Sequence, residues 1–150
     1  NNAPVANADT LAVNEGAGTV SGSVATNDSD SDNDPLTFSA TGTLPAGLTF
    51  NSNGSFTFDA NNAAYNSLAA GATQVLSVPY TVSDGQGGSA SSTLTITVTG
   101  TNDAPTVTAV TGPAATEGGA SVTATVVGVD PDQGAVLTYS LVNPVAGVSI

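Results

Sequence analysis

The sequence contains no Lys, Arg, His, Cys, Met or Trp, so its 12 acidic side chains have no cationic side chain to pair with. The absence of Cys excludes disulfides, zinc-thiolate sites and thiol nucleophiles. The absence of His removes the usual general base and the usual transition-metal ligand. A formal charge of −12 disfavours nucleic acid and anionic membranes as partners, because both are negatively charged. No apolar run approaches the roughly 18 residues that span a bilayer, and no signal peptide begins the sequence.

The uncompensated acidic charge points to a metal cation as its counterion. A ligand set made only of oxygen atoms favours a hard ion such as Ca²⁺. The 150 residues are 39% hydrophobic, which favours a folded chain over acidic disorder. A composition rich in Thr, Ser, Asn and Gly without Cys is typical of a bacterial secreted protein.

Alternation of apolar and polar residues is the main local pattern. Residues 93–99 read T-L-T-I-T-V-T, which predicts a half-buried antiparallel strand. Asn53-Gly54 lies between two such runs and predicts a hairpin turn. Residues 61–70 are weakly amphipathic and contain the only helical turn that we expect. Further strands are predicted at residues 5–13, 19–25, 36–40, 48–50, 55–58 and 75–82. Seven short strands in about 100 residues indicate an all-β antiparallel β-sandwich.

The chain also contains an internal repeat. Asn2-Ala3-Pro4 recurs as Asp103-Ala104-Pro105, a shift of 101 residues. Four further pairs keep the same order: Glu15-Gly16 with Glu117-Gly118, Asp30-x-Asp32 with Asp130-x-Asp132, Leu36-Thr37-Phe38 with Leu137-Thr138-Tyr139, and Ala46-Gly47-Leu48 with Ala146-Gly147-Val148. We therefore predict one complete repeat over residues 1–102 and the first half of a second over residues 103–150.

The second repeat has no counterpart of the Asn53-Gly54 hairpin or of the last strands. Half a sandwich exposes apolar faces and unpaired strand edges, so it is not expected to be stable alone. Either the sequence is an excerpt of a longer array, or strands of another molecule complete the second repeat.

The strongest candidate for metal binding is the loop 28–34, which reads D-S-D-S-D-N-D. Carboxylates at alternate positions of a flexible loop can converge on one cation, as they do in calcium loops. A solvated loop or a charged sheet edge is the alternative, but four like charges so close together repel one another. The loop lacks the twelfth-position Glu and the flanking helices of an EF-hand, which is therefore rejected.

Single acidic residues occur where predicted strands meet turns, so they are expected at the ends of the sandwich. They are Glu15, Asp59, Asp84 and Asp103. Asp84-Gly85, followed by Gly87-Gly88, is equally explained as a turn in which the Asp caps backbone amides. The stretch 102–105 is equally explained as a linker that Pro105 stiffens.

Together these motifs resemble VCBS and related bacterial cadherin-like repeats. The resemblance rests on Glu-Gly after the first strand, Asp-x-Asp before the third, Asp-Gly-x-Gly-Gly before the last and Val-Thr-Gly-Thr-Asn-Asp-Ala-Pro at the repeat boundary. It covers the whole chain. Such repeats occur in tandem in large secreted adhesins of the RTX type. The resemblance implies tandem immunoglobulin- or cadherin-like antiparallel β-sandwiches outside the cell.

Cadherin-like arrays hold Ca²⁺ between consecutive domains, so the resemblance implies two sets of ligands. The junction set comprises Glu15, Asp59, Asn102, Asp103, Asp130 and Asp132. The set at the start of the first repeat comprises Asn2, Asp30, Asp32 and Asp84. Two departures concern the junction: residues 59–61 read Asp-Ala-Asn where cadherins carry Asp-Arg-Glu, and the linker lacks the leading Asp and one Asn of the cadherin pattern.

The leading hypothesis for function is a non-catalytic spacer repeat of an extracellular bacterial adhesin, stiffened by Ca²⁺ and supporting cell attachment or biofilm formation. Its partners would be neighbouring repeats or identical subunits, and other domains would reach a surface or glycan target. One alternative is a subunit of a self-assembling extracellular filament, in which a neighbour's strands complete residues 103–150. Another is a carbohydrate- or ice-binding module that uses the Thr-rich face of residues 93–99. Catalysis by paired carboxylates is the least favoured reading.

Overall fold

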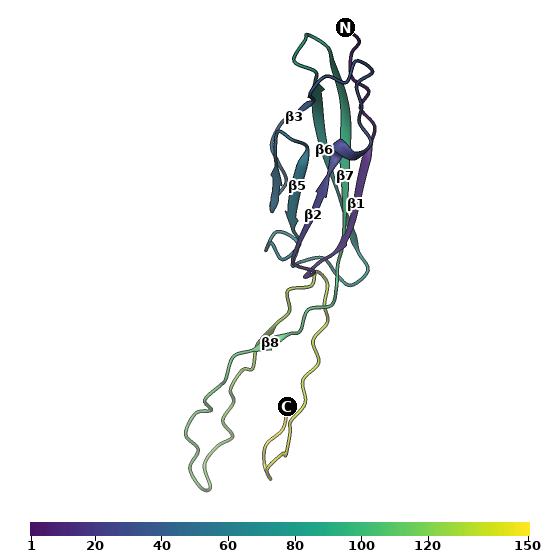
Figure 1. The fold of residues 1–150 in the computed structure, drawn as a ribbon. Helices are drawn as coiled ribbons and strands as arrows, with labels where there is room; N and C mark the ends of the chain where they lie inside the picture. The colour runs from purple at the N-terminus through teal and green to yellow at the C-terminus, as the bar shows by residue number, and fades with distance from the viewer. The chain divides into compact units, whose positions relative to one another are not determined.

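The computed structural model describes all 150 residues, which divide into two units, Asn1–Asn102 and Asp103–Ile150 (Figure 1). The first unit is a sandwich of two β-sheets. One sheet has the strand order β1-β7-β6-β3 and the other β2-β5-β4. The strands are β1 (Asp9–Asn14), β2 (Thr19–Ser23), β3 (Thr37–Ala40), β4 (Leu48–Phe50), β5 (Ser55–Asp59), β6 (Thr73–Ser83) and β7 (Ser89–Thr99). The predicted all-β sandwich is confirmed.

The core lies between the two sheets of the first unit and follows from the period-two pattern. Leu94, Ile96 and Val98 of β7 are fully buried, while the threonines between them are only partly covered. Tyr80 of β6 packs between two aromatic rings, with centroid distances of 6.3 Å to Phe38 and 6.0 Å to Phe50. Burying each such side chain contributes about 1.5–3 kcal/mol to the stability of the fold. The packed core fixes the strands relative to one another, and with them the positions of their ends.

One strand pair departs from the antiparallel prediction. β1 pairs with β7 in parallel, from Asp9 opposite Leu94 to Asn14 opposite Thr99. The predicted strand 5–13 is also shorter than expected, because its first part does not join this sheet. Val5 forms an isolated bridge with Ser29 instead.

The predicted helical turn at residues 61–70 is wrong. This segment consists of successive turns, in which Tyr65 N–H donates to the Asn62 carbonyl and Leu68 N–H to the Tyr65 carbonyl, at 3.0 Å each. Burial of Tyr65 explains the path: its ring packs 5.4 Å from that of Phe58, and its hydroxyl donates to the Ala46 carbonyl at 2.6 Å. The only helix is the 3₁₀ turn η1 (Val24–Thr26), and no helix is long and apolar enough to cross a membrane.

The predicted Asn53-Gly54 hairpin is confirmed between β4 and β5, where Phe50 lies opposite Phe56. Gly54 has φ 82°, a left-handed conformation that glycine adopts without steric cost. The Asn53 side chain accepts the Ser55 N–H at 3.0 Å. Residues 51–54, four in all, connect the two strands.

The second unit has little regular structure. Its two strands are β8 (Thr106–Val107) and β9 (Gly128–Val129), and they pair antiparallel. Many of its apolar side chains are exposed, among them Val107, Val122, Val129, Val136, Val142, Val145, Val148 and Ile150. The buried apolar core of the chain belongs entirely to the first unit.

Candidate metal centres

Three of the four carboxylates of the acidic loop converge. Asp30, Asp32 and Asp34 each offer an oxygen atom, and these oxygens lie within 4.8 Å of one another. The loop folds around Asp30, whose Oδ1 accepts the N–H groups of Asp32 at 2.8 Å and Asp34 at 3.4 Å. Asn33 adopts a left-handed conformation with φ 60°, which Asn tolerates better than most residues.

The second oxygen of Asp30 has no partner. Oδ2 is buried and makes no hydrogen bond. A buried carboxylate oxygen is costly unless a donor or a cation neutralises it, and the loop supplies neither. These three carboxylates, one of which has an unsatisfied oxygen, could hold a hard cation.

The first residues of the chain lie against this loop. The Asn2 N–H donates to Asp32 Oδ2 at 2.6 Å, and its side-chain amide reaches Asp32 Oδ1 at 3.3 Å. The Asn1 side-chain amide donates to Asp84 Oδ2 at 2.9 Å. Two consecutive residues thus connect the acidic loop to the turn that holds Asp84.

Asp84 is a buried carboxylate, only 2% exposed, held by hydrogen bonds. Its Oδ1 accepts the N–H groups of Gln86 at 2.8 Å and Gly88 at 2.9 Å. The Asn1 hydrogen bond and these backbone amides lower the pKa of Asp84, and together they outweigh the opposing effect of burial. Gly88 is required here, because a Cβ atom would fall on the carboxylate and 2.9 Å from the Ala3 Cα. The turn-capping reading of Asp84 therefore describes its hydrogen bonds well.

Asp28, the fourth carboxylate of the loop, turns towards the core. Its Oδ2 lies 3.1 Å from the hydroxyl of Tyr80, which also lies 2.8 Å from Asp9 Oδ2 and 2.8 Å from the Asn7 carbonyl. A phenol has one proton to donate, so three acceptors compete for it. Burial, and secondarily the charge of Asp28, raises the pKa of Asp9 despite its hydrogen bond to Tyr80. Burial first, then the bond to Asp9, raises the pKa of Tyr80.

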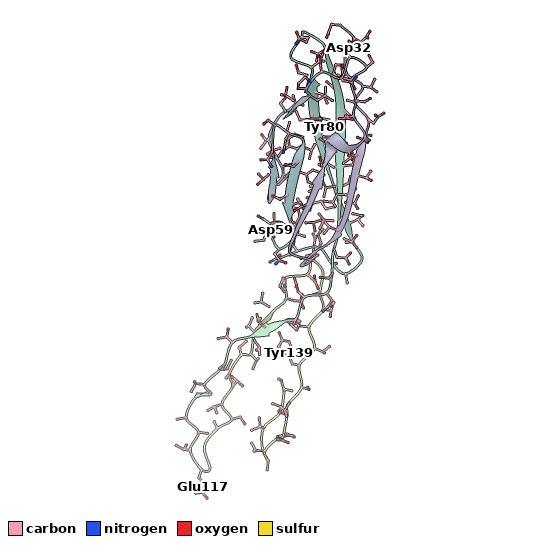
Figure 2. All side chains as sticks on the ribbon, viewed as in Figure 1. Asp32, Asp59, Tyr80, Glu117 and Tyr139 are labelled. Carbon is pink, nitrogen blue, oxygen red and sulfur yellow. The ribbon has the colours of Figure 1, made fainter.

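The opposite end of the first unit carries Glu15 and Asp59; Figure 2 labels Asp59 there and Asp32 at the other end. Glu15 is 5% exposed, and its Oε2 accepts the Thr101 N–H at 3.2 Å. Its Oε1 is buried without a partner. Gly16 donates to the Ala60 carbonyl at 3.1 Å, which places Glu15 beside the segment that follows β5. Asp59 Oδ1 accepts the Asn61 N–H at 3.0 Å.

The second unit repeats the arrangement seen around Asp32. The Asp103 N–H donates to Asp132 Oδ2 at 3.0 Å, and the Asp132 N–H donates to Asp130 Oδ1 at 2.9 Å. Asp132 Oδ1 is buried without a partner.

The bacterial cadherin-like domain family matches residues 1–100. The chain belongs to this family. The predicted resemblance to bacterial cadherin-like repeats is therefore confirmed. Among the curated proteins, none matches the chain.

One solved cadherin structure agrees with the fold of this chain. A human protocadherin-24 structure, EC1-2, is 25% identical with a TM-score of 0.55, and the match covers 89% of this chain and 64% of that one. An endo-fucoidan hydrolase of glycoside hydrolase family 107 is 26% identical with a TM-score of 0.45, covering 65% of this chain and 14% of that one. A SusE-like polysaccharide binding protein from Bacteroides thetaiotaomicron is 14% identical with a TM-score of 0.41, covering 65% and 15%. The chain spans less than two thirds of each.

Within the cadherin-like domain, several of the predicted ligands lie together. Asp30 and Asp32 meet, and Asn2 bonds to Asp32. The loop 28–34 was predicted to bind a cation as a whole, but the ligand set implied by the resemblance left out Asp34, and Asn1 was not predicted as a partner of Asp84. The D-x-D-x-D spacing was a signal for Asp34, whereas the sequence offers no signal for Asn1. The meeting of the junction set, Glu15, Asp59, Asn102, Asp103, Asp130 and Asp132, stays a prediction.

Proposed function

We propose that this bacterial cadherin-like domain is a spacer module of a secreted, cell-surface adhesin and that Ca²⁺ stiffens it. The module would support attachment or biofilm formation by separating an adhesive region from the cell. The observation that carries the proposal is the buried, unpartnered carboxylate oxygens of Glu15 and Asp30 in a chain without any cationic side chain. A divalent cation is the counterion that such oxygens lack.

The residues at the start of the domain fit Ca²⁺ in their chemistry. Ca²⁺ takes 6–8 oxygen ligands, supplied by carboxylates, amide carbonyls and water. Asp30, Asp32 and Asp34 provide the carboxylates, and no nitrogen or sulfur ligand is available to favour a softer metal. Asp84 and the side chain of Asn2 are the further oxygen donors proposed for this end.

The other end of the domain would take part in a junction with the next repeat. Glu15 and Asp59 are the proposed ligands from the first unit, and Asn102 and Asp103 those from the linker. From the second unit, the ligands would be Asp130 and Asp132. The unpartnered oxygens of Glu15 and Asp132 support their inclusion.

Residues 103–150 are, in this proposal, the first half of a second repeat. The local hydrogen bonds support it, because Asp103, Asp132 and Asp130 reproduce the pattern of their counterparts in the first unit. There, Asn2 N–H donates to Asp32 and Asp32 N–H to Asp30. The β8–β9 pair likewise corresponds to the bridge between Val5 and Ser29.

The cation would act on stiffness rather than on chemistry. Without it, clustered carboxylates repel one another across a short linker, and neighbouring repeats swing. With it, several chain segments share one centre, and the linker becomes rigid. Extracellular modules bind Ca²⁺ with a Kd near 10⁻⁴–10⁻³ M, so about 10 mM Ca²⁺ contributes roughly 1.4–2.7 kcal/mol per site.

The test is thermal unfolding of the 150-residue chain in 10 mM Ca²⁺ and in chelator. One site predicts a rise in Tm of about 6–22 °C, since 1 kcal/mol shifts the Tm of a domain of about 100 residues by about 4–8 °C. The Asp30→Asn variant should lose most of that rise. Glu117→Gln is the matched control, because it removes one exposed charge away from the proposed ligands. Mg²⁺ at the same concentration controls for screening, and a Tm that is the same in Ca²⁺, Mg²⁺ and chelator would refute the proposal.

A further inference from the structure

Strand β6 is covered along its whole length on one side but only in part on the other. All of its residues, Thr73–Ser83, pair with β7. On the opposite side β3 pairs only with the stretch from Tyr80 to Ser83, and Figure 1 shows β3 beside one end of β6. Residues 73–78 therefore form an open strand edge within the first unit.

The residues around the end of β3 explain why this edge is open. Thr41 is the last residue of that segment to bond to β6, and its N–H and its hydroxyl both donate to the Pro79 carbonyl, at 2.8 and 3.0 Å. Pro79 has no N–H to donate in return. Gly42 follows with φ 86°, a left-handed conformation that turns the chain out of the line of the strand. The open edge is therefore fixed by residues inside the first unit.

The open edge presents backbone groups that are available for pairing. Successive residues of a strand direct their N–H and C=O groups to opposite edges. The Pro79 carbonyl faces β3, so Thr73, Val75 and Ser77 present their backbone groups on that same side. No backbone group of a loop bonds to these three residues. An exposed edge of this kind is a template on which another strand can pair.

This edge also lacks the features that usually protect strand edges, which are charge, proline and short length. The sequence has no acidic residue from 60 to 83, although the chain carries 12. Val75 lies in the middle of the edge and is 63% exposed, more than any other large apolar side chain of the first unit. Among the other edge strands, β3 and β4 have only four and three residues, and β1 contains Asp9.

We propose that residues 73–77 of β6 dock against the same residues of a second copy of this chain, as an antiparallel pair centred on Val75. Charge favours a second copy, because two chains of −12 repel one another wherever their acidic residues face, and this edge carries none. Self-complementarity favours it as well. About a two-fold axis Val75 lies opposite Val75, and Thr73 lies opposite Ser77, so apolar meets apolar and hydroxyl meets hydroxyl.

The register follows from what borders the edge. Thr41 occupies the position beside Pro79, so an added strand cannot extend past it. At the other limit, Gly71 with φ 80° turns the chain just before Thr73. Centring on Val75 uses all three open residues, and each hydrogen-bonded pair exchanges two backbone bonds. The contact is smaller than the roughly 1,200 Å² of stable interfaces, so the dimer is expected at high protein concentration.

Single cysteines can report this register, because the chain has no Cys of its own. Residues opposite each other in a hydrogen-bonded pair lie about 5.5 Å apart between Cα atoms, which is within reach of a disulfide. Variants of the 150-residue chain are oxidised with glutathione disulfide in chelator and about 0.5 M NaCl, which screens repulsion between acidic surfaces. Val75→Cys should form a disulfide-linked dimer. Thr73→Cys and Ser77→Cys should cross-link poorly alone and readily when mixed. Thr10→Cys, at an exposed position on the far edge of the same sheet, is the control and should stay monomeric.

A charge variant tests the same contact at equilibrium by sedimentation. Val75→Glu places two like charges opposite each other and should weaken the dimer about 10-fold or more. Thr10→Glu adds the same charge to the same sheet away from the contact and should leave the Kd within about twofold. Dimerisation of the parent chain should strengthen as NaCl is added, because salt screens the repulsion between the two acidic chains.

Three results would overturn the inference. The first is a parent chain that stays monomeric at its highest soluble concentration. The second is a dimer that Val75→Glu leaves unchanged, which would assign the association to another surface, such as the exposed apolar side chains of the second unit. The third is Thr73→Cys cross-linking alone as fast as in the mixture with Ser77→Cys. All of these measurements are made in chelator, so their failure leaves the calcium response separately testable.

Discussion

The hydroxyl of Tyr80 offers a sharp test of how the buried acidic residues are held. Tyr80→Phe removes one oxygen and keeps the ring that packs between Phe38 and Phe50. The hydroxyl lies within 3.1 Å of two carboxylate oxygens, from Asp9 and Asp28, and of one carbonyl. The substitution therefore changes hydrogen bonding at a charged centre with little change in apolar packing.

The magnitude follows from the nature of the acceptors. A hydrogen bond to a charged group contributes about 1.5–3 kcal/mol, against about 0.5–1.5 kcal/mol for a neutral one. Tyr65 is the matched control, because its hydroxyl is similarly placed in the core but donates to a single neutral carbonyl, that of Ala46. We expect Tyr80→Phe to lower the free energy of unfolding at pH 7 by about 1.5–3 kcal/mol and Tyr65→Phe by about half as much.

The assay is urea unfolding of both variants and the parent chain, in chelator, at pH 7 and at pH 3.5. At the lower pH, protonated Asp9 can itself act as a donor, so the cost of Tyr80→Phe should shrink. The cost of Tyr65→Phe should not change, because no carboxylate is among its hydrogen-bond partners. A Tyr80→Phe cost no larger than that of Tyr65→Phe, or one that grows as the pH falls, would refute the reasoning.

Three further predictions concern single residues. The folded state raises the pKa of Asp9 above its ordinary value of 3.8, so its contribution to stability is present below pH 3.8 and is lost as the pH rises through the folded-state pKa. Asp9→Asn should therefore stabilise the chain at pH 7 and lose that advantage at low pH, as thermal scans at the two pH values will show. Gly22→Ala should cost about 1–3 kcal/mol in urea unfolding, because a Cβ would meet the ring of Phe56, and adding Phe56→Leu should relieve the clash. Glu15→Gln should raise the Tm in chelator, because it removes a buried charge with one unpartnered oxygen, and should reduce the Ca²⁺-dependent rise; an unchanged Ca²⁺ response would remove Glu15 from the ligand set.

Local sequence patterns predicted much of the fold. The alternation at residues 93–99 predicted strand β7 and its buried face, and Asn53-Gly54 predicted the hairpin, because both are properties of neighbouring residues. The strand predicted at residues 5–13 was too long because its pairing depends on residues that are not neighbours in sequence. Its N-terminal part bonds to residues far along the chain, Asn27 and Asp28, and alternation carries no information about such partners.

The sequence by itself determined the kind of chemistry available to this protein. A chain with twelve carboxylates and no cationic side chain can satisfy clustered acids only with neutral hydrogen-bond donors, protons or a metal ion. The sequence also located the acids at the ends of strands, since turns are where polar residues interrupt apolar alternation.

Only the tertiary structure decided which carboxylates act together. Asp28 and Asp30 stand two residues apart, yet Asp28 faces Tyr80 while Asp30 joins Asp32 and Asp34. Asn1 and Asp84 are 83 residues apart, yet they are bonded. The physical reason is that the direction of each loop side chain depends on the hydrogen-bond donors near it in the folded structure. Those donors come from parts of the chain that are distant in sequence.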